Sequence, residues 1–350
     1  MKSKLLPFNV SIIATVLNEE ATIAELMDSI VAQTWPPDEV VIVDGGSTDH
    51  TMELLLSYAD RMPLRVLAEP DCNISRGRNL AIEAATGEVI ASTDAGVLLH
   101  PHWLEEILRP FGRQSPPPSQ VVSGFFHAEP QSAFELALGA ATLPLQKEIN
   151  PRTFLPSSRS VAFTKEVWEE VGGYPEWLDY CEDLIFDLRL RRAGYRFRWA
   201  PAALVYFRPR PTLGAFFRQY YRYARGDGKA DLWLHRHLIR YASYLAGLAL
   251  LAGGLTAWQF WLLLLAGVAV HLYRPYRRLL HQIKGLSPRE ILKAALYVPV
   301  VGVAGDLAKM VGYPVGVWWR RRHRHSEDGL GGRVETQETP IPGDVDERQQ

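Results

Sequence analysis

The sequence predicts an α/β protein with a doubly wound parallel sheet, followed by a helical region that associates with a membrane. Strand-like and helix-like segments alternate along the first hundred residues, which is typical of parallel strands joined by right-handed crossovers. Polar side chains follow three of these strands at the point where each strand ends. The second half contains long apolar runs with many tryptophans and tyrosines, so the chain is built in two parts.

Short β-branched runs bounded by turn residues identify the strands. They lie at residues 10–14, 40–43, 64–67 and 89–91, with further strands at 121–126 and 160–163. Apolar residues at helical spacing predict helices over residues 21–33, 51–58 and 75–85. The strands and helices of the first half therefore alternate as a doubly wound sheet requires.

The strand ends bring polar side chains to one edge of the predicted sheet: Thr15 and Asn18, Asp44, and Asp94. Open α/β sheets bind ligands in the crevice beyond the carboxyl ends of their strands. For Asp94 alone a simple turn is an equal alternative, because Asp-x-Gly is common turn chemistry. The convergence of three strand ends favours a ligand site.

Composition narrows the class of ligand and the environment. The net charge of −1 over 350 residues argues against a nucleic-acid partner. The two cysteines, Cys72 and Cys181, provide neither a disulfide framework nor metal-ligand spacing, so we expect a reducing, cytosolic environment. Oxygen-rich side chains suit a nucleotide, yet the chain has neither a dinucleotide fingerprint after its first strand nor a Walker-type loop. The remaining expectation is a nucleotide-sugar.

Several short motifs resemble those of family 2 glycosyltransferases with the GT-A fold. In the first half they lie at residues 12–20, 40–51, 78–79, 87–94 and 101–104. In the second half they are Gly-Gly-Tyr at 172–174, Glu182-Asp183, and a Gln-x-x-Arg-Tyr sequence from Gln219 to Tyr223 that resembles the Gln-x-x-Arg-Trp motif of membrane-bound members. The resemblance covers roughly residues 9–228. It implies a GT-A domain, a nucleotide-diphospho-sugar donor and an Mg²⁺ or Mn²⁺ ion.

The resemblance also implies roles for residues of the donor half. They are the nucleoside pocket for Thr15, Leu17 and Glu19, a hydrogen bond to the base for Asp44, a place near the diphosphate for Arg78, and the ribose or metal for Asp94. Two departures weaken the metal prediction. Gly96 stands where the family has a second aspartate, and Gly45 follows Asp44 where the family has another carboxylate.

Glu182-Asp183 opens a predicted helix that Gly194 ends. Acidic residues in a first turn also stabilise the helix dipole, which is the structural alternative. The resemblance instead implies Asp183 as the general base that takes the proton of an acceptor hydroxyl, with Glu182 as the next candidate. A single positioned base suits an inverting transfer. Gln219, Arg222 and Tyr223 would then form the acceptor side, next to the membrane.

The apolar stretch 241–273 is either one long tilted helix or a hairpin, and Gly253-Gly254 near its middle favours the hairpin. The stretch 291–319 is long enough to span, re-enter or lie on a bilayer. A basic run at 320–324 then suggests a cytoplasmic-side anchor. We therefore expect a catalytic domain over 1–230, interfacial and transmembrane helices over 231–320, and a disordered cytosolic tail over 321–350.

These observations predict a multi-pass cell-membrane enzyme of the cell envelope with a cytoplasmic catalytic domain. It would be an inverting, hexosyltransferase-type enzyme that moves a sugar to a membrane lipid or lipid-linked glycan. A polysaccharide synthase is the alternative within the same class, although too few apolar segments follow for a translocation pore. A non-catalytic nucleotide-sugar-binding scaffold is the alternative from another class, which release of nucleoside diphosphate would exclude.

Overall fold

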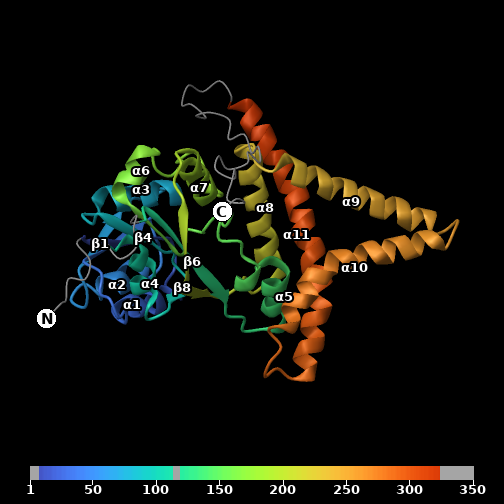
Figure 1. Ribbon diagram of the computed structural model, residues 1–350, viewed down its shortest axis with the longest axis horizontal. Coiled ribbons are helices and arrows are strands. Elements are labelled where there is room, and N and C mark those ends of the chain that lie inside the picture. The colour runs from blue at the N-terminus through green and yellow to red at the C-terminus, as the bar shows by residue number, and fades with distance from the viewer. Residues whose placement is uncertain (1–7, 113–118, 324–350) are drawn as a thin grey trace, which may run out of the picture.

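The computed structural model describes residues 8–112 and 119–323. Within them, an eight-stranded mixed sheet forms the centre of the first domain, in the order β3-β2-β1-β4-β7-β6-β8-β5 (Figure 1). The strands are β1 (Val10–Val16), β2 (Glu39–Asp44), β3 (Leu64–Ala68), β4 (Val89–Ser92), β5 (Val97–Leu99), β6 (Val121–Ala128), β7 (Val161–Thr164) and β8 (Phe197–Phe207).

The sheet has a parallel half and a mixed half. β3, β2, β1 and β4 run parallel, which confirms the prediction for this part. β7 is antiparallel to both β4 and β6, and β5 is antiparallel to β8, so the predicted parallel sheet does not extend further. The sequence did not predict β8, because Pro201 interrupts its pattern. The pairing of β6 with β8 is irregular there, with a register shift between Ser123 and Phe125.

Helices cover both faces of the sheet (Figure 1). They are α1 (Ile23–Val31), α2 (Thr51–Leu56), α3 (Ile74–Ala84), α4 (Trp103–Leu108), α6 (Lys165–Glu170) and α7 (Glu182–Arg192), with short 3₁₀ turns at Arg109–Phe111 and Gln146–Glu148. α5 (Ala133–Thr142) instead packs against the helices that follow the sheet. α1, α2 and α4 bury their apolar side chains in one cluster, and α3, α6 and α7 bury theirs in another.

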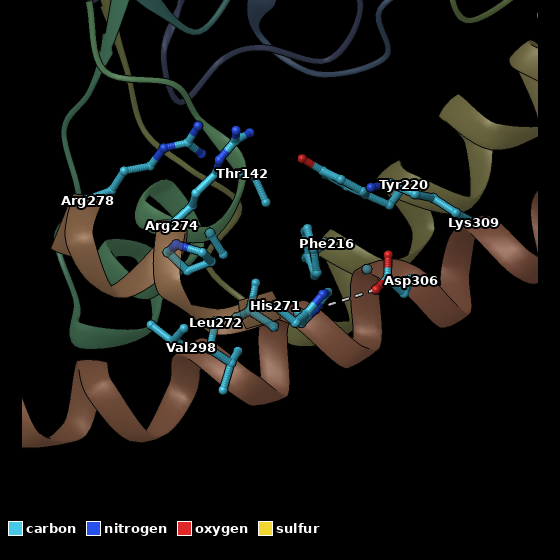
Figure 2. A pocket seen from close by; sticks show the side chains of 15 residues that line it. Thr142, Phe216, Tyr220, His271, Leu272, Arg274, Arg278, Val298, Asp306 and Lys309 are labelled. Atoms are coloured by element: carbon cyan, nitrogen blue, oxygen red, sulfur yellow. Dashed lines mark ion pairs between the residues drawn. The ribbon is translucent and has the colours of Figure 1, made fainter. Parts of the chain in front are cut away.

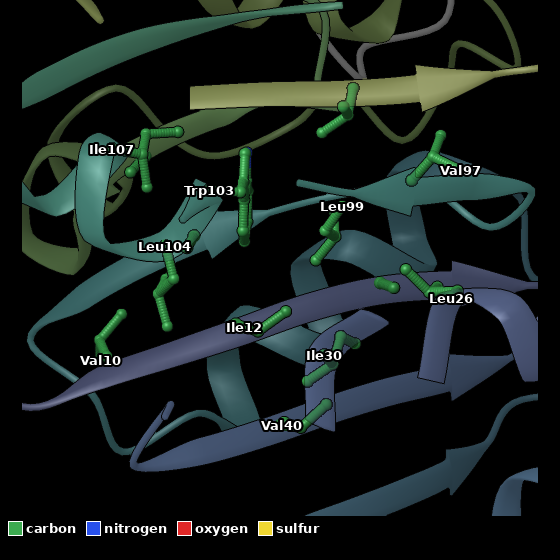
Figure 3. Close-up of a cluster of buried hydrophobic side chains, with 14 of the residues drawn as sticks. Val10, Ile12, Leu26, Ile30, Val40, Val97, Leu99, Trp103, Leu104 and Ile107 are labelled. Atoms are coloured by element: carbon green, nitrogen blue, oxygen red, sulfur yellow. The ribbon is translucent and has the colours of Figure 1, made fainter. Parts of the chain in front are cut away.

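The two clusters lie on opposite faces of the sheet because side chains alternate along a strand. Ile12 of β1 packs into the cluster with α1 and α4, whereas its neighbour Ile13 packs into the cluster with α3 and α7. Figure 3 shows the first cluster, which includes Trp103 of α4 and Leu99 of β5. The indole Nε1 of this fully buried tryptophan donates to Ser160 Oγ at 2.8 Å. The sheet is therefore a rigid support for the loops at its carboxyl edge.

Four longer helices follow: α8 (Leu213–Lys229), α9 (Leu234–Gly253), α10 (Gln259–Leu280) and α11 (Pro288–Arg322). α9 and α10 form a hairpin that projects away from the sheet, with its turn after Gly253, as the sequence predicted (Figure 1). α11 runs along α8 and α5. Glycines permit this close approach: a Cβ at Gly312 would lie 2.3 Å from the Tyr221 carbonyl oxygen, and one at Gly316 would lie 2.0 Å from that of Arg225.

Among the described residues, α11 is the one helix that is long and apolar enough to cross a membrane. This finding does not support the predicted multi-pass chain. The apolar parts of α9 and α10 are about 15 residues each, or about 22 Å at 1.5 Å per residue, and the hydrocarbon core is about 30 Å thick. Charged residues such as Arg240 and Arg274 end each apolar part. Exposed leucines along the hairpin and α11 nevertheless support membrane association. The basic run is described as far as His323, and the predicted tail beyond it lies outside the described residues.

We expect Gly316→Ala to lower the thermal unfolding midpoint, because its Cβ would force α8 and α11 apart. Overpacking of this kind costs about 1–3 kcal/mol. Gly302→Ala on the same helix is the control, since its Cβ would meet His271 Nε2 at an ordinary 3.6 Å. Equal midpoints for the two variants, measured on the purified full-length protein in detergent, would contradict the close packing of α8 and α11.

Candidate active site

The loops that leave β1 and β2 are bound to each other at the carboxyl edge of the sheet. The backbone N–H of Asn18 donates to Ser47 Oγ at 2.8 Å, and Asn18 Oδ1 accepts the backbone N–H of Thr48 at 2.9 Å. Asn18 has a φ of 54°, a left-handed conformation that asparagine tolerates better than most residues. The two loops thus form one continuous rim, as the convergence of strand ends predicted.

Asp44 is buried inside this rim rather than pointing freely into the crevice. Its carboxylate accepts the backbone N–H groups of Gly46 and Ser47 at 3.3 and 3.0 Å and the Ser47 hydroxyl at 2.5 Å. An ionised carboxylate has about four acceptor positions, so one is left for a ligand. The hydrogen bond from Asp44 to a base stays a prediction.

The other residues predicted for the nucleoside pocket lie around the same rim. Leu17 is 53% exposed. Thr15 is half-buried against α3, where a Cβ at Gly77 would lie 2.8 Å from its Cγ2. Glu19 accepts the Thr22 hydroxyl at 2.7 Å. Thr15, Leu17 and Glu19 therefore lie at one edge, although Thr15 packs on the protein.

Arg78 of α3 is buried and bridges two carboxylates. Its Nη2 lies 2.6 Å from Asp94 Oδ1, and its Nη1 lies 2.5 Å from Glu182 Oε1. The side chain is 2% exposed, and its guanidinium carbon lies 5.3 Å from the centre of the Tyr174 ring. The sequence predicted Arg78 near a diphosphate. That role stays a prediction; in the structure the buried side chain holds the loop after β4 against the start of α7.

Arg159 is a second cation beside Asp94. Its Nε lies 3.5 Å from Asp94 Oδ2, its side chain is 23% exposed, and it interacts electrostatically with Asp183. Sequence reasoning missed this residue because it follows a polar loop far from the recognised motifs. The predicted strand that begins one residue later was the signal that could have found it.

Glu182 and Asp183 form the first turn of α7, directly after Cys181, which has a left-handed φ of 67°. Glu182 is buried against Arg78, whereas Asp183 is half-buried and accepts the backbone N–H of Leu184 at 2.8 Å. Burial raises the pKa of both carboxyl groups, and the neighbouring charge of Asp183 raises that of Glu182 further. A carboxylate with a raised pKa is a better proton acceptor, which suits a general base.

Asp187 lies one turn after Asp183 and is fully buried in α7. Burial raises its pKa well above the usual range of an aspartate, and the charge of Asp183 acts in the same direction. The pKa of Asp187 is thus shifted in the same direction as that of Asp183, with burial as the main cause of both shifts. Asp187 provides a matched comparison for the half-buried carboxylate.

The predicted acceptor motif on α8 packs against Cys181, the residue that precedes Glu182-Asp183. Tyr223 accepts from Gln219 Nε2 at 2.8 Å, and its backbone carbonyl accepts the Cys181 thiol at 3.3 Å. Arg222 donates to the Tyr180 hydroxyl at 2.8 Å on the exposed side of the same segment. Tyr223 therefore lies near the candidate base Asp183, and Gln219 contacts Tyr223. Arg222 contacts Tyr180 instead.

Asp94 is the one predicted metal ligand, and it could contribute only a single carboxylate to a metal ion. No group of three or more His, Cys, Asp or Glu side chains gathers around a common point in the described part of the chain. Gly96, with a φ of 72°, supplies no side chain where a second carboxylate was expected. Mg²⁺ is commonly held by one or two carboxylates together with substrate phosphates and water. Asp94 is compatible with that kind of site.

A mixed sheet with this rim at its carboxyl edge and two acidic residues opposite it defines a nucleotide-sugar transferase fold. The family model for glycosyl transferase family 2 matches residues 11–145, and the model for glycosyl transferase family group 2 matches residues 120–301, more than half of the chain. The chain therefore belongs to the family 2 glycosyltransferases and uses a nucleotide-sugar donor.

Known proteins resemble the chain over most of its length. Glycosyltransferase AglE of Haloferax volcanii is 28% identical over 236 residues, which cover 65% of this chain and 75% of that protein. Succinoglycan biosynthesis protein ExoA of Rhizobium meliloti is 27% identical over 232 residues, covering 62% and 68%. The mannosyltransferase PcManGT of Pyrobaculum calidifontis, solved with GDP-Man and Mn²⁺, superposes with a TM-score of 0.60 at 24% identity, covering 84% of this chain and 88% of that one. This likeness confirms the predicted GT-A fold.

We expect Arg78→Met to destabilise the protein strongly, because it leaves Asp94 and Glu182 without their shared counter-charge. Removing one partner of a buried ion pair costs about 3–5 kcal/mol. Arg76→Met on the same helix is the control, since Arg76 is 39% exposed and its ion pair with Glu176 is long, at 3.4 Å. Such surface pairs contribute about 0–1 kcal/mol. Similar unfolding midpoints for the two variants would show that the buried bridge does not hold the domain together.

Proposed function

We propose that this chain is an inverting hexosyltransferase that moves a sugar from a nucleoside-diphosphate donor to a hydroxyl of a membrane lipid or lipid-linked glycan. The observation that carries the proposal is the position of Asp183. It is half-buried with a raised pKa, faces the Asp94 and Arg159 side of the crevice, and adjoins the helix that leads to the membrane-associated region.

In this proposal the donor lies along the rim at the ends of β1, β2 and β4. Thr15, Leu17, Glu19 and Asp44 surround its nucleoside, and Arg159 approaches its diphosphate. Asp94 would hold an Mg²⁺ or Mn²⁺ ion, which neutralises negative charge on the leaving diphosphate when it is bound. Arg78 positions Asp94 and Glu182.

The reaction is a single displacement at the anomeric carbon. Asp183 removes the proton of the acceptor hydroxyl while that oxygen bonds to the anomeric carbon. The bond from this carbon to the diphosphate oxygen breaks, and the nucleoside diphosphate leaves with the electron pair. Attack from the face opposite the leaving group inverts the configuration. The domain spans residues 1–230 in this proposal, and residues 231–320 hold it at the bilayer.

Asp183→Asn should lower kcat about 100- to 10,000-fold and leave donor binding nearly unchanged, because the amide cannot accept the proton. The measurement is nucleoside diphosphate release with a panel of nucleotide-sugars and membrane lipid extract, with products identified by mass spectrometry. Asp187→Asn is the matched control and should retain most activity, since Asp187 is buried in α7 one turn away from the proposed base. A variant Asp183→Asn that kept more than about a tenth of turnover would exclude Asp183 as the base and make Glu182 the next candidate.

The pH dependence of kcat/KM should show the raised pKa of the Glu182-Asp183 pair. A base must be deprotonated to act, so kcat/KM should rise with pH and reach its plateau well above pH 4, the usual range of a carboxyl group. The apparent pKa belongs to Glu182 and Asp183 together, because the two groups interact. The acid limb should be absent from the residual activity of Asp183→Asn. A wild-type profile that is flat from pH 5 to 8 would contradict burial of the base.

A further inference from the structure

A cavity of about 300 Å³ lies between α5, α8, α10 and α11, and none of the donor-rim residues lines it. Figure 2 shows Arg274 and Arg278 of α10 on one side and Tyr220 of α8 with Lys309 of α11 on the other. The Tyr220 hydroxyl points into the space between them. None of these residues belongs to the donor motifs. Tyr220 lies within the predicted acceptor segment Gln219–Tyr223.

The cavity is lined by four basic side chains, two of which form no close ion pair with a described carboxylate, although Lys309 also lies 4.9 Å from the centre of the Tyr220 ring. Arg278 pairs with Glu148 at 2.7 Å, and His271 lies 3.7 Å from Asp306. Asp306 is also 2.8 Å from Arg240, so its charge is already compensated. In contrast, Arg274 and Lys309 have no carboxylate within 4.0 Å among the residues the structure describes. Two basic side chains that line the same cavity without a close carboxylate favour an anionic ligand.

Apolar side chains also line the cavity, and the helices around it expose further apolar side chains. Those that line the cavity include Phe216, Val298 and Val301. Leu262, Leu263 and Leu265 on α10 are 54%, 58% and 62% exposed. A ligand that combines an anionic head with a hydrocarbon chain fits this distribution, with its head in the cavity and its chain along the hairpin. A free sugar or nucleotide would leave the apolar part without a partner.

A chain of two aromatic rings connects the cavity to the candidate base. The ring of Tyr220 lies 5.7 Å from that of Tyr223, centre to centre. Tyr223 accepts from Gln219 and interacts electrostatically with Asp183. A head group held at Tyr220 is therefore separated from Asp183 by the ring of Tyr223, one turn further along α8.

From this geometry we propose that the cavity binds the phosphate group of a lipid-linked acceptor, with Arg274 and Lys309 contacting the phosphate oxygens. The phosphate would anchor the acceptor so that its hydroxyl lies at Asp183. This assignment rests on the proposed function, because it names the class of acceptor for the same reaction. The proposed phosphate site is separate from the residues predicted to bind the donor.

The test measures binding without requiring transfer. Dodecyl phosphate, dodecanol and inorganic phosphate are titrated by calorimetry into the full-length protein in detergent. We expect wild type to bind dodecyl phosphate more tightly than either of the other two. Arg274→Gln with Lys309→Gln should weaken it by about tenfold or more, because charge-assisted hydrogen bonds to phosphate are lost. Arg274→Lys with Lys309→Arg should restore most of the affinity, which excludes a folding defect.

Arg277→Gln is the matched control, since Arg277 lies on the same helix, pairs with Glu148 at 2.5 Å and does not line the cavity. Unchanged affinity in the Arg274 and Lys309 double variant, or equal loss in Arg277→Gln, would overturn the proposal. Displacement of dodecyl phosphate by phosphatidylglycerol vesicles would assign the cavity to bulk phospholipid and overturn it as well. Because Asp183→Asn should bind dodecyl phosphate normally, a failure here is separable from a failure of the proposed reaction.

Discussion

The buried guanidinium of Arg78 joins the two halves of the catalytic domain. Charge burial is costly unless the partners are close and well oriented. Arg78 of α3 meets Asp94, which follows β4, and Glu182, which begins α7, at 2.6 and 2.5 Å. Glu182 is 104 residues from Arg78 in the sequence, so the bridge fixes the separation of the donor edge from the acidic pair. Asp183 follows Glu182 directly, and its position relative to Asp94 is set by the same contacts.

A second set of contacts couples this centre to the membrane-associated helices. Asp179, just before the acidic pair, binds Lys229 at 2.9 Å and also pairs with Arg225, both on α8. The Cys181 thiol donates to the Tyr223 carbonyl of the same helix. α8 in turn packs on α11 through glycines that allow backbone contact. The segment that carries Asp183 is therefore held against a helix whose other side contacts the longest apolar helix of the described chain.

Local sequence patterns predicted the parallel half of the sheet because each strand is a short apolar run with a helix after it. The hairpin at Gly253 followed from an apolar stretch too long for one span with glycines at its middle. The pattern could not predict the burial of Arg78, since a helix of this composition normally exposes an arginine. It could not predict that Arg159 reaches Asp94 either, because that contact depends on how β7 pairs with β4. Such tertiary pairings have no local signal.

The balance of charge in the crevice gives a physical reason for a divalent cation despite the glycine at position 96. Asp94, Glu182 and Asp183 face two guanidinium groups, those of Arg78 and Arg159. The crevice is thus already negative when all three carboxyl groups are ionised, which is consistent with the raised pKa values of the acidic pair. A diphosphate adds further negative charge in a partly desolvated place, where like charges repel strongly. A cation that arrives with the donor would offset this repulsion, and with Asp94 as its one protein ligand it would depend on the diphosphate for most of its remaining contacts.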